Sequence, residues 1–236
     1  MAKLKDVMRQ LKTLGTEQTR KTFARHGIEG DVFGVKVGDL KQVVKTTRGD
    51  QPLAEALYDT GNYDAMYLAG LIGDGTQMSQ ATLRGWAEQA KWHTIAGTAV
   101  AWVATESEHA ASLAAVWIDD DSELLQCAGW TTLCGIVATK DDTALDIAGL
   151  RKLLKSMKKR MAKAPNRVRY VMNSFVISVG CYVTALSDAA RETAAGIGVV
   201  DVDMGNTACK VPDAVAAIEK VASMGRLGLK RKTFRC

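Results

Sequence analysis

Apolar residues recur every three or four positions along almost the whole chain, and this periodicity constrains the fold more than any other feature. Residues 4–14 show it clearly, and Gly15 follows as a residue suited to end a helix. Thr16, Ser79 and Ser122 stand where a side-chain oxygen can cap the next helix. The pattern predicts helices of roughly 10–16 residues joined by short turns, which favours antiparallel pairs stacked side by side.

Further boundaries fit the same picture. Ser107 is expected to begin another helix, and Pro165 to open one that runs to about Tyr182. Only residues 198–204 have a strand-like composition. We therefore expect an all-α fold in which one domain of stacked helix pairs spans residues 1–236 and ends in a basic tail at about 226–236.

Composition places the chain among ordinary globular proteins, with 47% hydrophobic and 24% charged residues. The five cysteines include no Cys-x-x-Cys pair, which suits a reducing compartment, so we expect a cytoplasmic protein. No continuous apolar stretch resembles a signal peptide or a membrane span. The three histidines lack metal-ligand spacing, and we expect no metal, no cofactor and a monomer.

Charge is distributed unevenly along the sequence. Residues 1–49 carry 11 basic and 5 acidic side chains, residues 50–150 carry 3 and 15, and residues 151–236 carry 17 and 6. This asymmetry indicates that part of the surface attracts polyanions while the middle of the chain presents acidic groups to solvent. Balancing of charge for solubility is the alternative explanation.

The strongest functional signal is the segment 151–170, which contains nine basic residues and no acidic one. On a helical wheel the apolar residues form a stripe and the basic residues lie opposite; the stripe is Leu150, Leu153, Leu154, Met157 and Met161. Such a surface favours nucleic acid, because neutralised phosphates release counterions. An acidic protein, a membrane surface and plain solvation remain alternatives.

Four segments resemble the AlkD-like DNA alkylation repair proteins, a superfamily of HEAT-like-repeat DNA glycosylases. They are the residues 33–40, 63–70, 91–95 and 164–175, with the sequences FGVKVGDL, YDAMYLAG, KWHTI and APNRVRYVMNSF. The likeness extends over nearly the whole chain. It implies an α-α superhelix, a solenoid of HEAT-like antiparallel helix pairs with a concave, positively charged groove for duplex DNA. For active members it also implies excision of cationic N3- or N7-alkylated purines.

This chain departs from the active members at the positions that carry charge. In those members a carboxylate follows a tryptophan by four positions and stabilises the developing sugar cation. Here Trp92 is kept, but Ala96 stands at the carboxylate position. A basic residue of the family aligns with Cys127, and a second aromatic wall aligns with Phe175. The scaffold is retained and the charged parts are lost, which puts excision in doubt.

We weigh hypotheses of different classes. The first is a DNA-binding protein of the repair type, with weak or absent excision, that grips double-stranded and possibly alkylated DNA. The second is an active glycosylase, with Trp92 as an aromatic wall and Glu106 as a substitute acid. The third is a helical scaffold for an acidic protein. The expected nucleic-acid contacts are Arg84, Trp86, Trp92, Lys158, Lys159, Arg160, Lys163, Arg167, Arg169, Phe175, Lys230, Arg231 and Lys232.

Two groups of residues also have a plain structural explanation. Trp86, Trp102, Trp117 and Trp130 suit the interfaces between helices better than a groove, because large aromatic rings fill such interfaces. His93, beside Trp92, fits a partly exposed structural histidine better than a general base.

Overall fold

A computed structural model describes residues 2–235, and every regular element within that range is helical. This confirms the all-α prediction. Residues 198–204 are irregular and form no strand. The helices are α1 (Ala2–Leu14), α2 (Glu17–Arg25), α3 (Val37–Thr47), α4 (Gln51–Tyr58), α5 (Tyr63–Ile72), α6 (Gln80–Gln89), α7 (His93–Ile95), α8 (Ala101–Glu106), α9 (Ala110–Trp117), α10 (Glu123–Thr139), α11 (Ile147–Met161), α12 (Asn166–Tyr182), α13 (Ser187–Ile197) and α14 (Ala214–Ser223).

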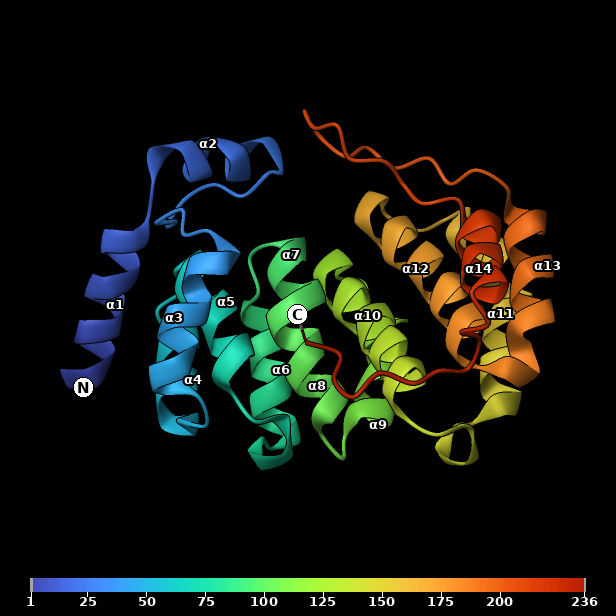
Figure 1. The fold of residues 1–236 in the computed structure, drawn as a ribbon, viewed down its shortest axis with the longest axis horizontal. Coiled ribbons are helices and arrows are strands. Elements are labelled where there is room, and N and C mark those ends of the chain that lie inside the picture. The colour runs from blue at the N-terminus through green and yellow to red at the C-terminus, as the bar shows by residue number, and fades with distance from the viewer. Residues whose placement is uncertain (1, 236) are drawn as a thin grey trace.

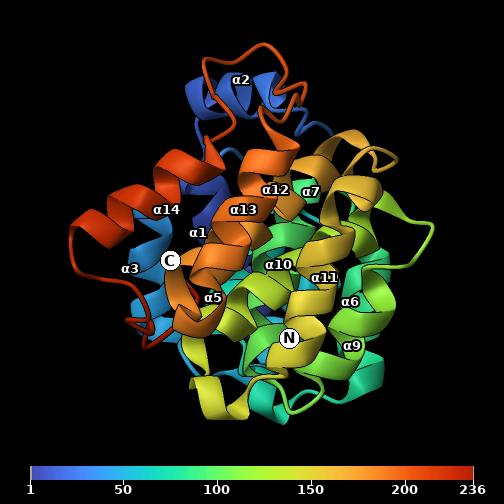
Figure 2. The same cartoon turned by 90° about the vertical axis from the view of Figure 1, so that its right-hand side faces the viewer.

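The helices follow one another along a stack in the order of the sequence (Figure 1). Figure 2 looks along this stack and shows α6, α9 and α11 on one side, α3 and α14 on the other, and α5, α10 and α12 between them. α10 packs against α9 and α12, and α12 packs against α11 and α13. We call α5, α7, α8, α10 and α12 the inner row, and α4, α6, α9 and α11 the outer row.

Large aromatic side chains fill the space between the rows. Trp86, Trp102, Trp117 and Trp130 are all buried, which confirms their assignment to helix interfaces. The rings of Tyr58 and Trp86 are stacked with centroids 3.9 Å apart, and the Tyr58 hydroxyl donates to the Trp86 carbonyl at 2.6 Å. Burial of such rings supplies much of the driving force that holds one helix pair on the next.

Several helix boundaries agree with the sequence. The side chains of Thr16, Ser79 and Ser122 cap α2, α6 and α10, each accepting from the amide three residues on. α12 follows Pro165 and ends at Tyr182 as expected. Ser107 differs, because its hydroxyl accepts from the His109 amide in a turn and α9 begins only at Ala110.

The helix after Trp92 contains a π-helical turn, η2 (Ala96–Val100), between α7 and α8. Gly70 of α5 lies against this turn, and a Cβ atom at Gly70 would stand 2.3 Å from the Cα of Ala99. A side chain at position 70 would therefore force the two helices apart. Turns of this kind interrupt the regular ladder and change the direction of the side chains that follow.

A buried carboxylate fixes the connection between α2 and α3. Asp64, at the start of α5, accepts hydrogen bonds from the amides of Phe33, Gly34 and Val35 at 2.7, 3.0 and 2.8 Å. Burial raises the pKa of this carboxyl, and the three amides oppose that shift. The irregular segment before α3 is thus held by one side chain from the neighbouring pair.

Two irregular segments cross the stack. The segment between α13 and α14 extends toward α2, at the opposite end of the stack (Figures 1 and 2). A Cβ atom at Gly205 would stand 2.7 Å from the Arg25 carbonyl, so this segment touches the end of α2. The chain after α14 turns back and reaches the middle of the stack (Figure 1). We call residues 226–235 the C-terminal strap.

Within residues 2–235 no single helix has both the length and the apolar composition of a membrane span. One pair of helices, Asn166–Tyr182 and Thr184–Ile197, has that length and composition when the two are taken together, but the pair is bent by 118°.

Candidate nucleic-acid interface

A cavity of about 450 Å³ opens on the inner row between η2, α10 and α12. We call it the inner groove. α12 contributes Arg167, Tyr170 and Ser174, which lie on one face because they are spaced three and four positions apart. Thr131 of α10 and His93 of α7 line the cavity with them. The lining therefore combines a cation, an aromatic ring, an imidazole and several hydroxyl groups.

Three segments from outside the inner row border this groove. His26 lies at the end of α2, Met204 belongs to the α13–α14 segment, and Phe234 belongs to the C-terminal strap. Asn166, the first residue of α12, holds the second of these segments by two hydrogen bonds with the backbone of Asp203, both at 2.8 Å. The groove is therefore built from residues that lie at both ends of the sequence.

The position of Arg167 is set by two contacts. Its amide donates to a carboxylate oxygen of Glu123, the first residue of α10, at 2.7 Å. Its guanidinium Nη1 lies 3.4 Å from the sulfur of Met204. Because Glu123 accepts from the amide, the amide is not free to bind a phosphate, whereas the guanidinium lines the groove.

His93 is uncharged at neutral pH. Burial lowers its pKa to about 4, and the positive charges of Arg167 and His26 add to this effect. A neutral imidazole can both donate and accept hydrogen bonds. The sequence alone favoured a structural role for His93. In the structure its side chain lines the inner groove.

No carboxylate of residues 2–235 lines the inner groove. Ala96, at the family's carboxylate position, is fully buried beneath it, and the next residue, Gly97, lines the cavity. Burial raises the pKa of the Cys127 thiol to about 12, so this group stays protonated at neutral pH. The groove therefore offers no anionic group to stabilise a developing sugar cation.

Three aromatic residues expected to touch DNA are buried instead. Trp86 is stacked on Tyr58, and Phe175 has no exposed surface because it packs against Trp130. Trp92 retains 9% of its surface and packs edge-on against Tyr63 at 5.3 Å, outside the groove lining. These three assignments are wrong. Burial of an aromatic ring between helices stabilises the fold more than its exposure in a groove would.

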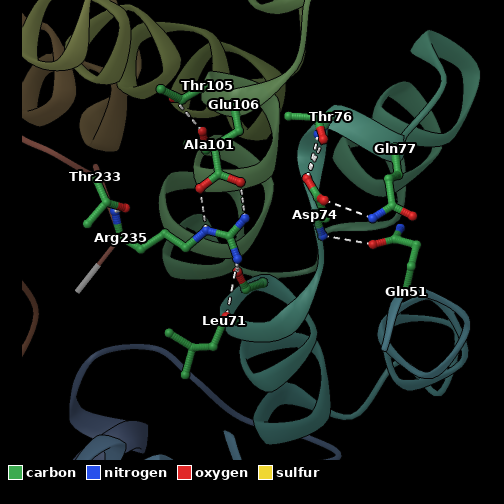
Figure 3. A network of polar contacts seen from close by, with 11 residues as sticks. Gln51, Leu71, Asp74, Thr76, Gln77, Ala101, Thr105, Glu106, Thr233 and Arg235 are labelled. Atoms are coloured by element: carbon green, nitrogen blue, oxygen red, sulfur yellow. Dashed lines mark hydrogen bonds and ion pairs between the residues drawn. The ribbon is translucent and has the colours of Figure 1, made fainter. Parts of the chain in front are cut away.

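The substitute acid, Glu106, is also unavailable in this structure. Its carboxylate binds the guanidinium of Arg235, whose Nε donates to Oε1 at 2.7 Å and whose Nη2 donates to Oε2 (Figure 3). Arg235 Nη1 also donates to the carbonyls of Gly70 and Leu71 at the end of α5. Glu106 lines a separate cavity beside α3, so its assignment as the acid of the groove is wrong.

The basic residues of the C-terminal strap have different surroundings. Lys230 donates to the Val137 carbonyl at 2.9 Å and pairs with Asp142 at 2.8 Å, so it holds the strap to the end of α10 rather than contacting a ligand. Arg231 is exposed and lies over the Phe234 ring at 5.8 Å, beside the groove. Lys232 is exposed. Direct DNA contact by Arg231 and Lys232 stays a prediction.

The remaining expected contacts lie mostly away from the groove. Arg84 pairs with Glu88 on α6, in the outer row. Lys158, Lys159 and Arg160 lie on α11, also in the outer row, and Arg160 pairs with Asp119 at 2.6 Å. Lys163 is exposed in the turn that follows α11, while Arg169 is half-buried and donates to Asn166 at 3.3 Å. These cations therefore do not line the inner groove, and direct DNA contact by them stays a prediction.

A clue to the groove was present in the sequence. The lining positions of α10 and α12 recur at i, i+4 and i+7, as in Cys127, Thr131 and Cys134. These stripes of small polar residues on otherwise apolar helices mark an open inner face. Among residues 2–235 no group of three or more His, Cys, Asp and Glu side chains could hold a metal ion.

The architecture defines the chain as a HEAT-like-repeat helical solenoid. The chain belongs to the family described as DNA alkylation repair enzyme, which matches residues 7–190. A solved structure with 36% identity and a TM-score of 0.90, covering 99% of both chains, represents a new family of proteins related to the HEAT-like repeat DNA glycosylases with affinity for branched DNA structures.

Two bacterial sequences are similar over most of their length. One is the uncharacterized protein Lmo0209 of Listeria monocytogenes serovar 1/2a, with 31% identity, and the other is the uncharacterized protein Lin0241 of Listeria innocua serovar 6a, with 30% identity. Each match covers 89% of this chain and 93% of the relative. The family prediction from the sequence is confirmed.

Proposed function

We propose that this protein binds DNA in the inner groove, prefers branched DNA to a linear duplex, and has weak or absent base-excision activity. The observation that carries the proposal is the face of α12 on which Arg167, Tyr170 and Ser174 line a cavity without a carboxylate. The affinity of the structural relative for branched DNA supports the same class of ligand.

The size and lining of the cavity favour an unpaired nucleotide. A volume of about 450 Å³ is that of a small-ligand pocket, so it accommodates a nucleotide and not a segment of duplex. An unpaired base can stack on the half-buried Tyr170 ring, while Arg167 pairs with the adjacent phosphate. Branch points supply unstacked bases, which a continuous duplex does not.

The charge of the groove favours DNA binding over base excision. Excision of an alkylated base needs stabilisation of positive charge on the sugar, which a carboxylate provides. The inner groove offers Arg167 and a neutral His93 instead. A cation attracts the phosphate but opposes the developing sugar cation, so binding without efficient excision follows.

The experiment compares a fluorescein-labelled three-way junction with a linear duplex of the same sequence by anisotropy, across a salt series. Tighter binding to the junction, with an affinity that falls steeply with salt, is expected. Equal affinity for both DNAs overturns the preference, and a flat salt profile overturns DNA binding through charge. Single-turnover release of 7-methylguanine from a defined oligonucleotide tests excision, and rapid release by the wild type contradicts that part of the proposal.

A further inference from the structure

The most basic segment of the chain lies on the opposite side of the solenoid from the inner groove. α11 buries Leu154, Met157 and Met161 against its neighbours, and none of its residues lines the groove. Its outward surface carries four exposed lysines, and a fifth, Lys163, is exposed in the turn that follows it. We call Lys152, Lys155, Lys158, Lys159 and Lys163 the basic ridge.

The ridge is not neutralised by the protein itself. None of its lysines forms an ion pair within the part of the chain that the structure describes, residues 2–235. The neighbouring Arg160 is paired with Asp119. Asp120 and Asp121 follow Asp119 in the turn before α10. Asp119 lies on the side of the ridge that faces α9.

The dimensions of the ridge suit a nucleic-acid backbone. From Lys152 to Lys159, within α11, the helical rise gives about 10 Å. Four cations over that length approach the spacing of phosphates along one strand, about one every 3.4 Å of helix axis. An anion with a repeating charge therefore satisfies the ridge better than a single phosphate does.

The ridge also continues to the groove around the edge of the solenoid. The turn at residues 162–165 joins α11 to α12, and Lys163 is exposed in it. Arg167, in the first turn of α12, then faces the groove. Basic residues are thus present on the inner row, in the connecting turn and on the outer row.

One straight duplex cannot contact both surfaces. The inner groove lies on the inner row and Lys152, Lys155 and Lys159 lie on α11 in the outer row, so a duplex in contact with both must bend around the edge of the solenoid at residues 162–165. The persistence length of DNA, about 150 base pairs, opposes such a bend. A branched molecule meets this geometry easily, because its arms diverge at the branch point.

We infer that the basic ridge is a second DNA-binding surface, which holds one arm of a branched DNA while the branch point occupies the inner groove. This inference rests on the proposed function of the groove and goes beyond it. It assigns to the outer row a further part of the preference for branched DNA, because the ridge holds an arm that a linear duplex does not offer.

The test compares two matched double variants. In the ridge variant, Lys155→Glu with Lys159→Glu reverses two exposed charges on one face of α11. In the control variant, Lys5→Glu with Lys12→Glu reverses two exposed charges on α1, at the far end of the stack (Figure 1). Equal melting temperatures by circular dichroism establish that both variants fold like the wild type.

The ridge variant should bind a three-way junction at least about tenfold more weakly, with a shallower salt dependence, and bind linear duplex within about twofold of the wild type. The control should keep both affinities. Wild-type affinity of the ridge variant for the junction overturns the inference, and so does an equal loss for junction and duplex. Failure of the wild type to bind any DNA overturns the proposed function itself, which separates the two cases.

Discussion

The guanidinium of Arg235 binds both carboxylate oxygens of Glu106, a residue 129 positions earlier in the sequence (Figure 3). The same guanidinium donates to the carbonyls of Gly70 and Leu71, which end α5 and carry the partial negative charge of that helix terminus. One side chain near the end of the chain therefore joins two inner-row helices and fixes the strap across them.

Replacement of this arginine should lower stability. Arg235→Ala leaves the Glu106 carboxylate and two helix-end carbonyls without their donor, and we expect a loss of about 1–3 kcal/mol in the free energy of unfolding. Lys232→Ala, at an exposed position of the same strap, is the control and should change little. Urea denaturation measures both, and equal stabilities would show that the strap contributes nothing through this pair.

Stability should depend on pH through His93. Burial lowers the pKa of this group from 6.5 to about 4, so the unfolded chain binds a proton that the folded chain does not. The contribution of neutral His93 to the free energy of unfolding is therefore fully present above about pH 6.5 and decreases as the pH is lowered toward 4. Because the His93 side chain is partly exposed, we expect this contribution to be about 2 kcal/mol.

His93→Gln isolates that contribution from other titrating groups. The wild type should lose about 2 kcal/mol more than the variant between pH 7 and pH 4.5, measured by chemical denaturation at each pH. Parallel losses in the two proteins would contradict the depressed pKa.

The buried carboxylate of Asp64 is a second structural anchor. Asp64→Ala leaves the amides of Phe33, Gly34 and Val35 without an acceptor in a buried position, and we expect a loss of about 3 kcal/mol or more. Asp64→Asn keeps one acceptor oxygen and should lose less. Thermal and urea unfolding rank the three proteins, and an Asn variant less stable than the Ala variant would contradict this explanation.

Ala96 and Gly97 should respond differently to the same substitution. Ala96 is fully buried, so Ala96→Asp buries an unpaired carboxylate and should cost about 3 kcal/mol or more. A Cβ atom at Gly97 meets only the Thr131 hydroxyl, at 3.5 Å, so Gly97→Asp should fold and place its carboxylate in the groove. There it should repel phosphate and weaken DNA binding. Equal destabilisation by the two variants would show that Gly97 has no open space.

Much of the fold could be predicted from the sequence because its determinants are local. Apolar spacing and capping by Thr16, Ser79 and Ser122 specify the helices, and their lengths specify the pairing. The apolar stripe of α11 likewise predicts which of its faces is buried. It does not tell whether the opposite face points to the concave or the convex side, because that depends on where the whole pair sits in the stack.

The candidate site was less predictable because its determinants are distant in sequence. His93 and Tyr170 meet only through the stacking of three helix pairs, and no local pattern joins Glu106 to Arg235. The family likeness identified the correct fold but drew attention to Trp92 and Phe175, whose rings pack in the interior here. Exposed cations were visible in the sequence, whereas their distribution between the two rows was not.

The central claim, DNA binding in the inner groove, is tested most directly by two charge reversals of the same kind. Arg167→Glu changes the groove, and Arg84→Glu changes an exposed arginine on the outer row, where it pairs with Glu88. Anisotropy with a labelled three-way junction should show at least about a tenfold loss of affinity for Arg167→Glu and less than about a twofold loss for Arg84→Glu. Equal losses, or a larger loss for Arg84→Glu, would place the DNA elsewhere on the protein and contradict the account.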